Sequence, residues 1–228
     1  HLKGADQINR LGPIRVTSAG LLTPREVVIG MVAAFAVAAV FGVYLISRGG
    51  TPILIIGILS IIVAVAYTGG PFPLGYNGLG DLFVFIFFGM FGTVGTFYVH
   101  TLTLTMTPFL VALPIACLVT NIIIVNNVRD VDTDRAVGKR TLAVLFGKNF
   151  ARAEYAALAI IAYLTPIVLW ALGGFTFAVL LPIITTHSAY RLIREIYTLE
   201  GAALNSVLGR TAQLLALYGA LWAIGVAI

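Results

Sequence analysis

Carboxylates, amides and cations are concentrated in one short stretch, residues 126–141. The stretch holds three of the nine acidic residues and four of the fourteen Lys and Arg, and it directly follows the apolar run 108–125. If that run is a helix that continues past residue 125, Asn126, Asp130 and Asp134 recur every four residues and share one face. Two carboxylates one turn apart, with an amide one turn earlier, offer oxygen ligands suited to Mg²⁺. The spacing therefore predicts a magnesium site.

The cations just beyond this face suit a phosphate group. Lys139 and Arg140 follow the carboxylates closely. The alternative is an ordinary solvated loop whose charges only fix membrane orientation. Asn127 favours a functional interpretation, because a polar residue where a span meets the membrane interface is costly unless it is used. Asp132 falls on another face, and we expect it either to be solvated or to support the metal ligands without touching the metal.

The composition is that of an integral membrane protein. Hydrophobic residues make up 60% of the chain and charged residues 10%, whereas soluble domains are nearer a quarter charged. A single cysteine, Cys117, excludes an intrachain disulfide and a cysteine-based metal cluster, and its apolar surroundings predict a buried, inert thiol. The net charge is +5, and the charged residues lie between the hydrophobic segments. This pattern indicates a role in membrane orientation and argues against a nucleic-acid partner.

Hydrophobic segments recur along the chain and predict an all-α fold. We interpret residues 1–228 as one domain, a polytopic bundle of transmembrane helices. A span of roughly 20 apolar residues crosses the bilayer, and shorter runs are extendable at their ends. The seven predicted spans are 27–46, 53–67, 82–99, 108–125, 156–172, 175–185 and 211–228.

These spans divide the connecting segments into two alternating sets with very different charge. One set comprises segments 1–26, 68–81, 126–155 and 187–210, and it carries thirteen Lys and Arg and all nine acidic residues. The other set carries only Arg48. The positive-inside rule predicts that the charged side, with the acidic stretch, is cytoplasmic in the plasma membrane.

Two of the charged segments have further features. Residues 67–81 contain five glycines and two prolines, which predicts an irregular loop, and a structureless loop of this length is typically functional. Residues 187–210 predict a surface helix, because Tyr190, Ile193 and Tyr197 (or Ile196) recur at helical spacing.

Magnesium, carboxylates and cations at a membrane face favour a reaction in which a lipid loses diphosphate. The metal and the cations neutralise the departing diphosphate, while the spans hold the hydrocarbon tail and exclude water from a carbocation-like centre. A small transporter is the alternative from another class, but it would favour polar residues deep within the spans, whereas these charges stay at one end.

Four segments resemble the UbiA superfamily of intramembrane prenyltransferases. Residues 126–141, NNVRDVDTDRAVGKRT, resemble its second aspartate-rich motif. Residues 67–81, YTGGPFPLGYNGLGD, residues 10–20, RLGPIRVTSAG, and residues 204–208, LNSVL, are most similar to the menaquinone branch, the 1,4-dihydroxy-2-naphthoate polyprenyltransferases. The resemblance spans almost the whole chain.

The resemblance implies nine helices around a central cavity, in which two aspartate-rich motifs face each other across Mg²⁺ and a prenyl diphosphate. Asp130 and Asp134 match the second motif. Only the tail of the first motif, Lys3 to Asp6, is present, so we expect the first two helices and half of the metal site to lie upstream. We therefore expect the 228 residues alone to be inactive.

The implied reaction transfers a polyprenyl group from an all-trans polyprenyl diphosphate to 1,4-dihydroxy-2-naphthoate, releasing diphosphate and CO2 and giving demethylmenaquinol. Other acceptors, 4-hydroxybenzoate or homogentisate, remain open within the superfamily. The protein's partners would be the prenyl diphosphate, the aromatic acceptor and membrane lipid. The expected metal ligands are Asp130, Asp134 and Asp6, and the expected catalytic residues are Asp130, Asp134 and Lys139. The expected substrate-binding residues are Asn126, Asn127, Arg129, Arg140, Lys3, Arg15, Tyr76 and Tyr98.

Overall fold

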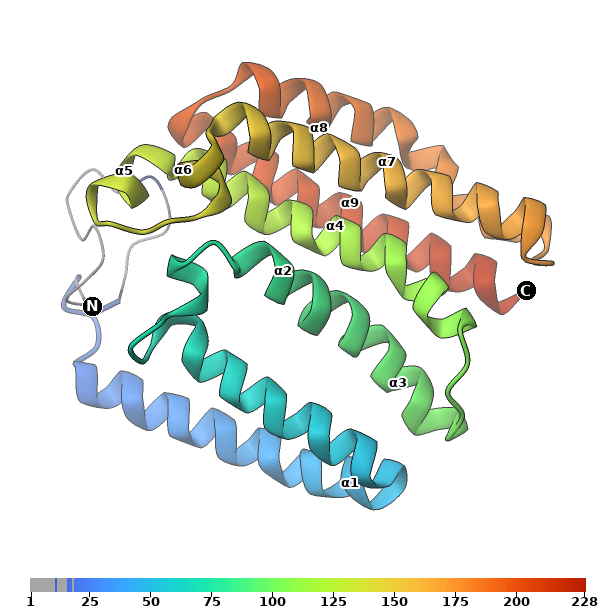
Figure 1. Ribbon diagram of the computed structural model, residues 1–228, viewed down its shortest axis with the longest axis horizontal. Coiled ribbons are helices and arrows are strands. Elements are labelled where there is room, and N and C mark those ends of the chain that lie inside the picture. The colour runs from blue at the N-terminus through green and yellow to red at the C-terminus, as the bar shows by residue number, and fades with distance from the viewer. Residues whose placement is uncertain (1–10, 12–15, 18) are drawn as a thin grey trace.

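The computed structural model describes residues 11, 16–17 and 19–228, and these residues form helices and loops without a β-strand (Figure 1). The prediction of an all-α fold is confirmed. Five helices are long and apolar enough to cross a membrane, and the chain is an integral membrane protein. Their bounds are Pro24–Thr68, Gly80–Thr101, Thr107–Arg129, Lys148–Leu172 and Gly201–Ala227.

The first of them, α1 (Pro24–Thr68), contains both of the first two predicted spans. It begins with a capping box, in which the Thr23 hydroxyl accepts from the backbone N–H of Glu26 and the Glu26 carboxylate accepts from that of Thr23. At Gly50 the backbone leaves the helical region, with φ 62° and ψ −148°, a conformation that favours glycine. The chain reverses there, so α1 forms two antiparallel arms (Figure 1).

The third predicted span is a continuous helical rod with a π-helical middle. It comprises α2 (Gly80–Val84), η2 (Phe85–Phe91) and α3 (Gly92–Thr101). Gly89 lies directly against Ala116 of α4 (Thr107–Arg129), and a Cβ on Gly89 would overlap the Ala116 backbone and side chain. The absence of a side chain at Gly89 therefore brings this rod close to α4.

Helix α4 is the centre of the bundle. Its residues Cys117, Leu118, Ile124 and Val125 are at most 1% exposed, and it packs against η2, α7 and α9. The expected burial of Cys117 is confirmed. Two short helices follow α4, namely α5 (Val131–Ala136) and α6 (Leu142–Phe146). The helix carrying the acidic stretch thus ends sooner than predicted, at Arg129, and resumes at Val131.

The C-terminal half corrects two predictions. After α7 (Lys148–Leu172), the 3-10 helix η3 (Phe177–Thr185) runs directly into α8 (Thr186–Thr198). The predicted span 175–185 is therefore the first part of a longer rod, and it is not among the five long apolar helices. The predicted surface helix 187–210 is wrong as one element, because the chain breaks at Leu199, forms η4 (Gly201–Ala203) and begins α9 (Leu204–Ala227).

The helical spacing left Tyr197 and Ile196 open as alternatives, and Ile196 is the one that is buried. Ala189, Leu192 and Ile196 of α8 are buried, whereas Tyr190 and Tyr197 are exposed. The helical period was correct, but the small and aliphatic residues face the bundle because they pack more closely against α7 and α9 than tyrosines would.

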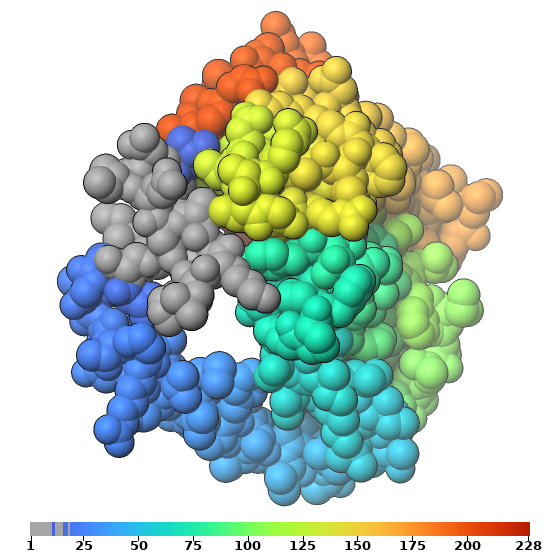
Figure 2. Space-filling view, turned by 60° about the vertical axis from the view of Figure 1, so that its left-hand side comes forward, coloured from blue at the N-terminus to red at the C-terminus, as the bar shows by residue number. Residues whose placement is uncertain are grey.

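The charged segments gather at one end of the bundle. The loop before α2, helices α5 and α6, and the link from α8 to α9 lie at that end, opposite the turn at Gly50 and the C-terminus (Figure 1). Glu200 in the link pairs with Lys148 at 2.7 Å and Arg152 at 2.9 Å, both on α7. Seen from this end, the molecule is hollowed between the arms of α1 and the loop before α2 (Figure 2). For the described residues, the predicted division of charge between the two ends is confirmed.

Candidate active site

Arg129, the last residue of α4, joins two other predicted site residues, Asp130 and Asn126, and one that was not predicted, Asn205. Its guanidinium donates two hydrogen bonds to the Asp130 carboxylate, both 2.7 Å long. It also donates to the side-chain oxygens of Asn126, at 2.7 Å, and Asn205, at 2.8 Å. The Arg129 side chain is only 5% exposed, so its charge is directed at these groups and holds them in place.

The helix change at Asp130 preserves the predicted spacing. The Asp130 backbone N–H donates to Asn126 O at 3.1 Å, and the Asp134 N–H donates to Asp130 O at 2.8 Å. These bonds keep the three residues one turn apart although the backbone leaves the helical region at Asp130. The structure thus brings Asn126, Asp130 and Asp134 to one side, as the sequence predicted.

Lys139 turns back onto the second carboxylate. Gly138 has a φ of 73° and ends α5 with a reversal that a side chain would disfavour. This reversal lets Lys139 Nζ reach Asp134 Oδ2 at 2.9 Å. Burial raises the pKa of the Asp134 carboxyl above its ordinary value, and the nearby charge of Asp130 also raises it, while Lys139 lowers it.

The loop between α1 and α2 is ordered against this turn. It contains one 3-10 turn, η1 (Leu74–Tyr76), although the sequence predicted no regular structure there. The backbone N–H of Arg140 donates to Tyr76 O at 2.8 Å, and the ammonium of Lys139 lies 5.8 Å from the Tyr76 ring centroid. The loop is therefore one wall of the site, which supports the prediction that it is functional.

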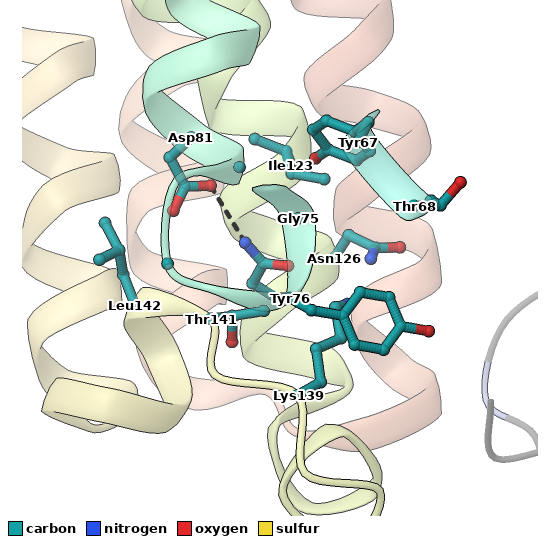
Figure 3. A pocket seen from close by; sticks show the side chains of 13 residues that line it. Tyr67, Thr68, Gly75, Tyr76, Asp81, Ile123, Asn126, Lys139, Thr141 and Leu142 are labelled. Atoms are coloured by element: carbon teal, nitrogen blue, oxygen red, sulfur yellow. Dashed lines mark hydrogen bonds between the residues drawn. The ribbon is translucent and has the colours of Figure 1, made fainter. Parts of the chain in front are cut away.

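A polar cavity of about 200 Å³ lies between this loop and α4 (Figure 3). Asp81, at the start of α2, is 4% exposed and accepts a hydrogen bond from Asn127 Nδ2 at 3.0 Å. The lining residues are Tyr67, Thr68, Gly75, Tyr76, Gly78, Gly80, Asp81, Ile123, Asn126, Asn127, Lys139, Thr141 and Leu142.

Sequence reasoning missed Asp81 and Asn205 as site residues. Asp81 gave the same signal as Asn127, a polar residue at the boundary of an apolar span. Asn205 gave a weaker signal, as part of the segment 204–208 that resembled the family. Asn205 also donates to the backbone oxygen of Leu11 at 2.8 Å, which places Leu11 beside Asn205.

The remaining predicted residues have different positions. Arg140 is exposed beside the cavity. Tyr98 lies near Gly49, at the turn of α1, and seventeen residues along the helix from Asp81, about 25 Å at 1.5 Å per residue. The structure does not bring Tyr98 to those predicted site residues that it describes. Lys3, Asp6 and Arg15 lie outside the described residues.

The described residues fit a divalent cation in part. No group of three His, Cys, Asp or Glu side chains in this part of the chain forms a metal site alone. However, Asp130 and Asp134 are close enough to repel each other, and paired carboxylates that repel are the donors a Mg²⁺ ion would join. The donor set fits Mg²⁺ if further oxygens come from a substrate or from elsewhere in the protein.

An apolar helical bundle with carboxylates, amides and cations gathered at one membrane end defines a membrane-embedded enzyme acting on a lipid with an anionic head. The chain belongs to the UbiA prenyltransferase family, whose family model matches residues 4–208. The recognition of this family from the sequence is confirmed.

Curated relatives make the comparison more specific. The chain is 31% identical to the 1,4-dihydroxy-2-naphthoate octaprenyltransferase of Escherichia coli strain K12, over 99% of this chain and 75% of the relative. It is 34% identical to the enzyme of the same name from Mycobacterium tuberculosis, over 71% of this chain and 55% of the relative. It is also 32% identical to the human UbiA prenyltransferase domain-containing protein 1, over 70% of this chain and 46% of the relative.

Proposed function

We propose that this protein transfers a polyprenyl group from an all-trans polyprenyl diphosphate to 1,4-dihydroxy-2-naphthoate. Diphosphate and CO2 leave, and the product is demethylmenaquinol. The observation that carries the proposal is the pair Asp130 and Asp134, aligned beside Lys139 at the charged end of an apolar bundle. The naphthoate is the proposed acceptor because it appears in the names of several relatives.

Asp130 and Asp134 would hold Mg²⁺, with Asp6 as a further proposed ligand outside the described residues. The bound ion would neutralise charge on the departing diphosphate. Lys139 and Arg140 would donate to phosphate oxygens. Arg129 was expected to do the same, but the contacts described above support another role, in which it orients the Asp130 carboxylate.

An apolar groove beside the polar cavity suits the hydrocarbon part of the substrate. The groove is about 640 Å³ and lies between the second arm of α1 and the rod that begins with α2. Tyr67 lines both the groove and the polar cavity. A substrate with its diphosphate near Lys139 would therefore have apolar space next to its reactive carbon, where water is excluded from an allylic cation. The groove is lined by Ser60, Val63, Ala64, Tyr67, Phe83, Val84, Phe87 and Phe88.

The charged end of the bundle would face the cytoplasm at the plasma membrane. The predicted excess of Lys and Arg on this side supports that orientation. Water-soluble acceptor and Mg²⁺ would then reach the site from the cytoplasm, while the tail stays in the bilayer.

The direct test is Asp130→Ala in the protein at its natural length, purified from membranes and assayed with polyprenyl diphosphate, the naphthoate and Mg²⁺. We expect transfer to fall at least about a thousandfold, because one metal ligand is lost and the Arg129 charge loses its partner. Membrane insertion should persist. The matched control is Asp132→Ala, which removes a carboxylate that is 75% exposed on the same segment.

Chelation of divalent cations is expected to abolish wild-type transfer reversibly. Retained transfer by Asp130→Ala, or in excess chelator, would contradict the proposed site. Supplying 4-hydroxybenzoate or homogentisate in place of the naphthoate tests the acceptor separately, since a preference for either would keep the reaction class and change the substrate.

A further inference from the structure

Asp81 has an arrangement that the reaction described so far does not use. Its carboxylate is buried at the start of a membrane-spanning rod. One oxygen, Oδ1, accepts from Asn127, and no described residue donates a hydrogen bond to the other oxygen. Asp81 nevertheless lines the polar cavity, and Figure 3 shows the second oxygen on the side away from the Asn127 bond. An oxygen of a cavity-lining carboxylate that has no described donor can accept a hydrogen bond from a ligand in the cavity.

The surroundings restrict what that donor is. Lys139 is near enough to act on Asp81 electrostatically, but its hydrogen bond goes to Asp134. A metal ion at Asp81 would lie close to the Lys139 ammonium. Asp81 would be its only carboxylate from the cavity lining, because the neighbouring Glu154 carboxyl is not part of that lining. A neutral hydroxyl meets neither difficulty. Tyr67, Tyr76 and Ile123 give the cavity walls that suit an aromatic ring.

We propose that Asp81 binds the hydroxyl-bearing aromatic acceptor, its free carboxylate oxygen accepting a hydrogen bond from a ring hydroxyl. This inference rests on the proposed function and names the group that recognises the acceptor. Asn127 fixes the carboxylate through the other oxygen. The cavity of about 200 Å³ has room for one or two fused rings but not for a polyprenyl chain. The adjoining apolar groove, which shares Tyr67, places the tail next to the ring.

The hydrogen bond also has a chemical consequence. A hydroxyl bonded to a carboxylate is a stronger electron donor to its ring, because the carboxylate draws the proton away from the oxygen. The ring carbon that attacks the allylic cation becomes more nucleophilic as a result. Asp81 therefore binds and orients the acceptor, and its effect is expected mainly on steps in which the acceptor takes part.

The test compares Asp81→Asn with wild-type protein, each at its natural length in lipid nanodiscs with Mg²⁺. The amide is isosteric and can keep its oxygen toward Asn127, so it presents NH2 to the cavity. We expect kcat/KM for the naphthoate to fall about tenfold or more, while KM for the prenyl diphosphate changes less than about twofold. Asp132→Asn, the same change at an exposed position, should leave both values unchanged.

The two monomethyl ethers of the naphthoate give a readout that a purely structural role would not alter. The wild-type protein should use at least one ether about tenfold less well than the parent acceptor, and Asp81→Asn should lose that preference. An unchanged acceptor kcat/KM in the variant, or an effect confined to the prenyl diphosphate, overturns the assignment of Asp81. If the variant fails to fold, the wild-type protein alone decides. Equal kcat/KM values of the wild-type protein for the two ethers and the parent naphthoate overturn the assignment of Asp81.

These outcomes are distinct from failure of the proposed function. If the wild-type protein prenylates no hydroxylated aromatic acceptor, the function itself is refuted and the inference with it. If the wild-type protein is active and Asp81→Asn is indistinguishable from it, only the role of Asp81 is refuted.

Discussion

Replacing Arg129 by lysine tests whether one buried guanidinium assembles the site. The substitution keeps the positive charge and removes the planar fork. The guanidinium makes four hydrogen bonds, two to Asp130 and one each to Asn126 and Asn205. An ammonium group on a single nitrogen can keep the ion pair with Asp130, but it cannot also reach two amides on different sides.

The expected loss follows from the bonds that lysine cannot make. Each hydrogen bond to a charged group contributes about 1.5–3 kcal/mol, so the loss of both amide bonds removes at least about 3 kcal/mol. The Arg129 side chain is only 5% exposed, so water does not replace the missing donors. For a chain of this size a loss of that amount lowers the unfolding temperature by roughly 6–12 °C.

Thermal unfolding in detergent measures this loss, and the dependence of transfer on Mg²⁺ concentration measures how well Asp130 is held. We expect Arg129→Lys to unfold earlier and to need more Mg²⁺ for half-maximal transfer. Arg135→Lys is the control, because Arg135 is exposed on the neighbouring helix. If Arg129→Lys unfolds within about two degrees of the control and has the same Mg²⁺ requirement, Arg129 does not organise the site.

Two further substitutions test the packing and the charged end. Gly89→Ala puts a Cβ 2.3 Å from Ala116, so we expect about 1–3 kcal/mol of destabilisation, whereas Gly42→Ala, with nothing within 4 Å, should not destabilise; equal unfolding temperatures would contradict the close packing. Glu200→Gln removes a carboxylate whose pKa is lowered by its two cationic partners on α7. A carboxyl whose pKa is lower in the folded than in the unfolded protein stabilises the fold above its unfolded-state pKa. This contribution is lost as the pH falls through the folded-state pKa. The free energy of unfolding of wild type should therefore exceed that of Glu200→Gln at neutral pH and equal it in acid. Glu200 is largely exposed, so the difference should stay below about 1 kcal/mol, and a difference that grows toward low pH would refute this pairing.

Most of the bundle could be predicted from hydropathy, because apolar runs of membrane length leave little choice of structure. The predicted boundaries failed where composition is ambiguous. Residues 187–210 are polar with helical spacing, and nothing local indicates that the chain breaks at Leu199. Burial of Ile196 and exposure of Tyr197, the two alternatives that the spacing left open, depend on the surfaces of α7 and α9, which periodicity within one helix does not describe.

For the site as well, the sequence predicted the local arrangement but not the contacts between distant residues. The spacing of Asp130 and Asp134 is local, and backbone hydrogen bonds preserve it even across a helix break. The contacts of Asp81 with Asn127 and of Arg129 with Asn205 join residues 46 and 76 positions apart. Such pairs depend on how helices pack, so the sequence alone identified Asn127 and Arg129 as site residues but not their partners Asp81 and Asn205.

The charges of the assembled site explain why cation and diphosphate would bind together. Three carboxylates, those of Asp81, Asp130 and Asp134, lie near two cations, Arg129 and Lys139. Both cations already make hydrogen bonds to carboxylates, so a diphosphate arriving alone would add negative charge beside groups of the same sign. Asp130 and Asp134 would hold a divalent ion whose charge would offset this repulsion, and Lys139 could then donate to phosphate oxygens. In the structure the two cations are counterions of the carboxylates, and under the proposed function Lys139 would donate to the diphosphate when it binds.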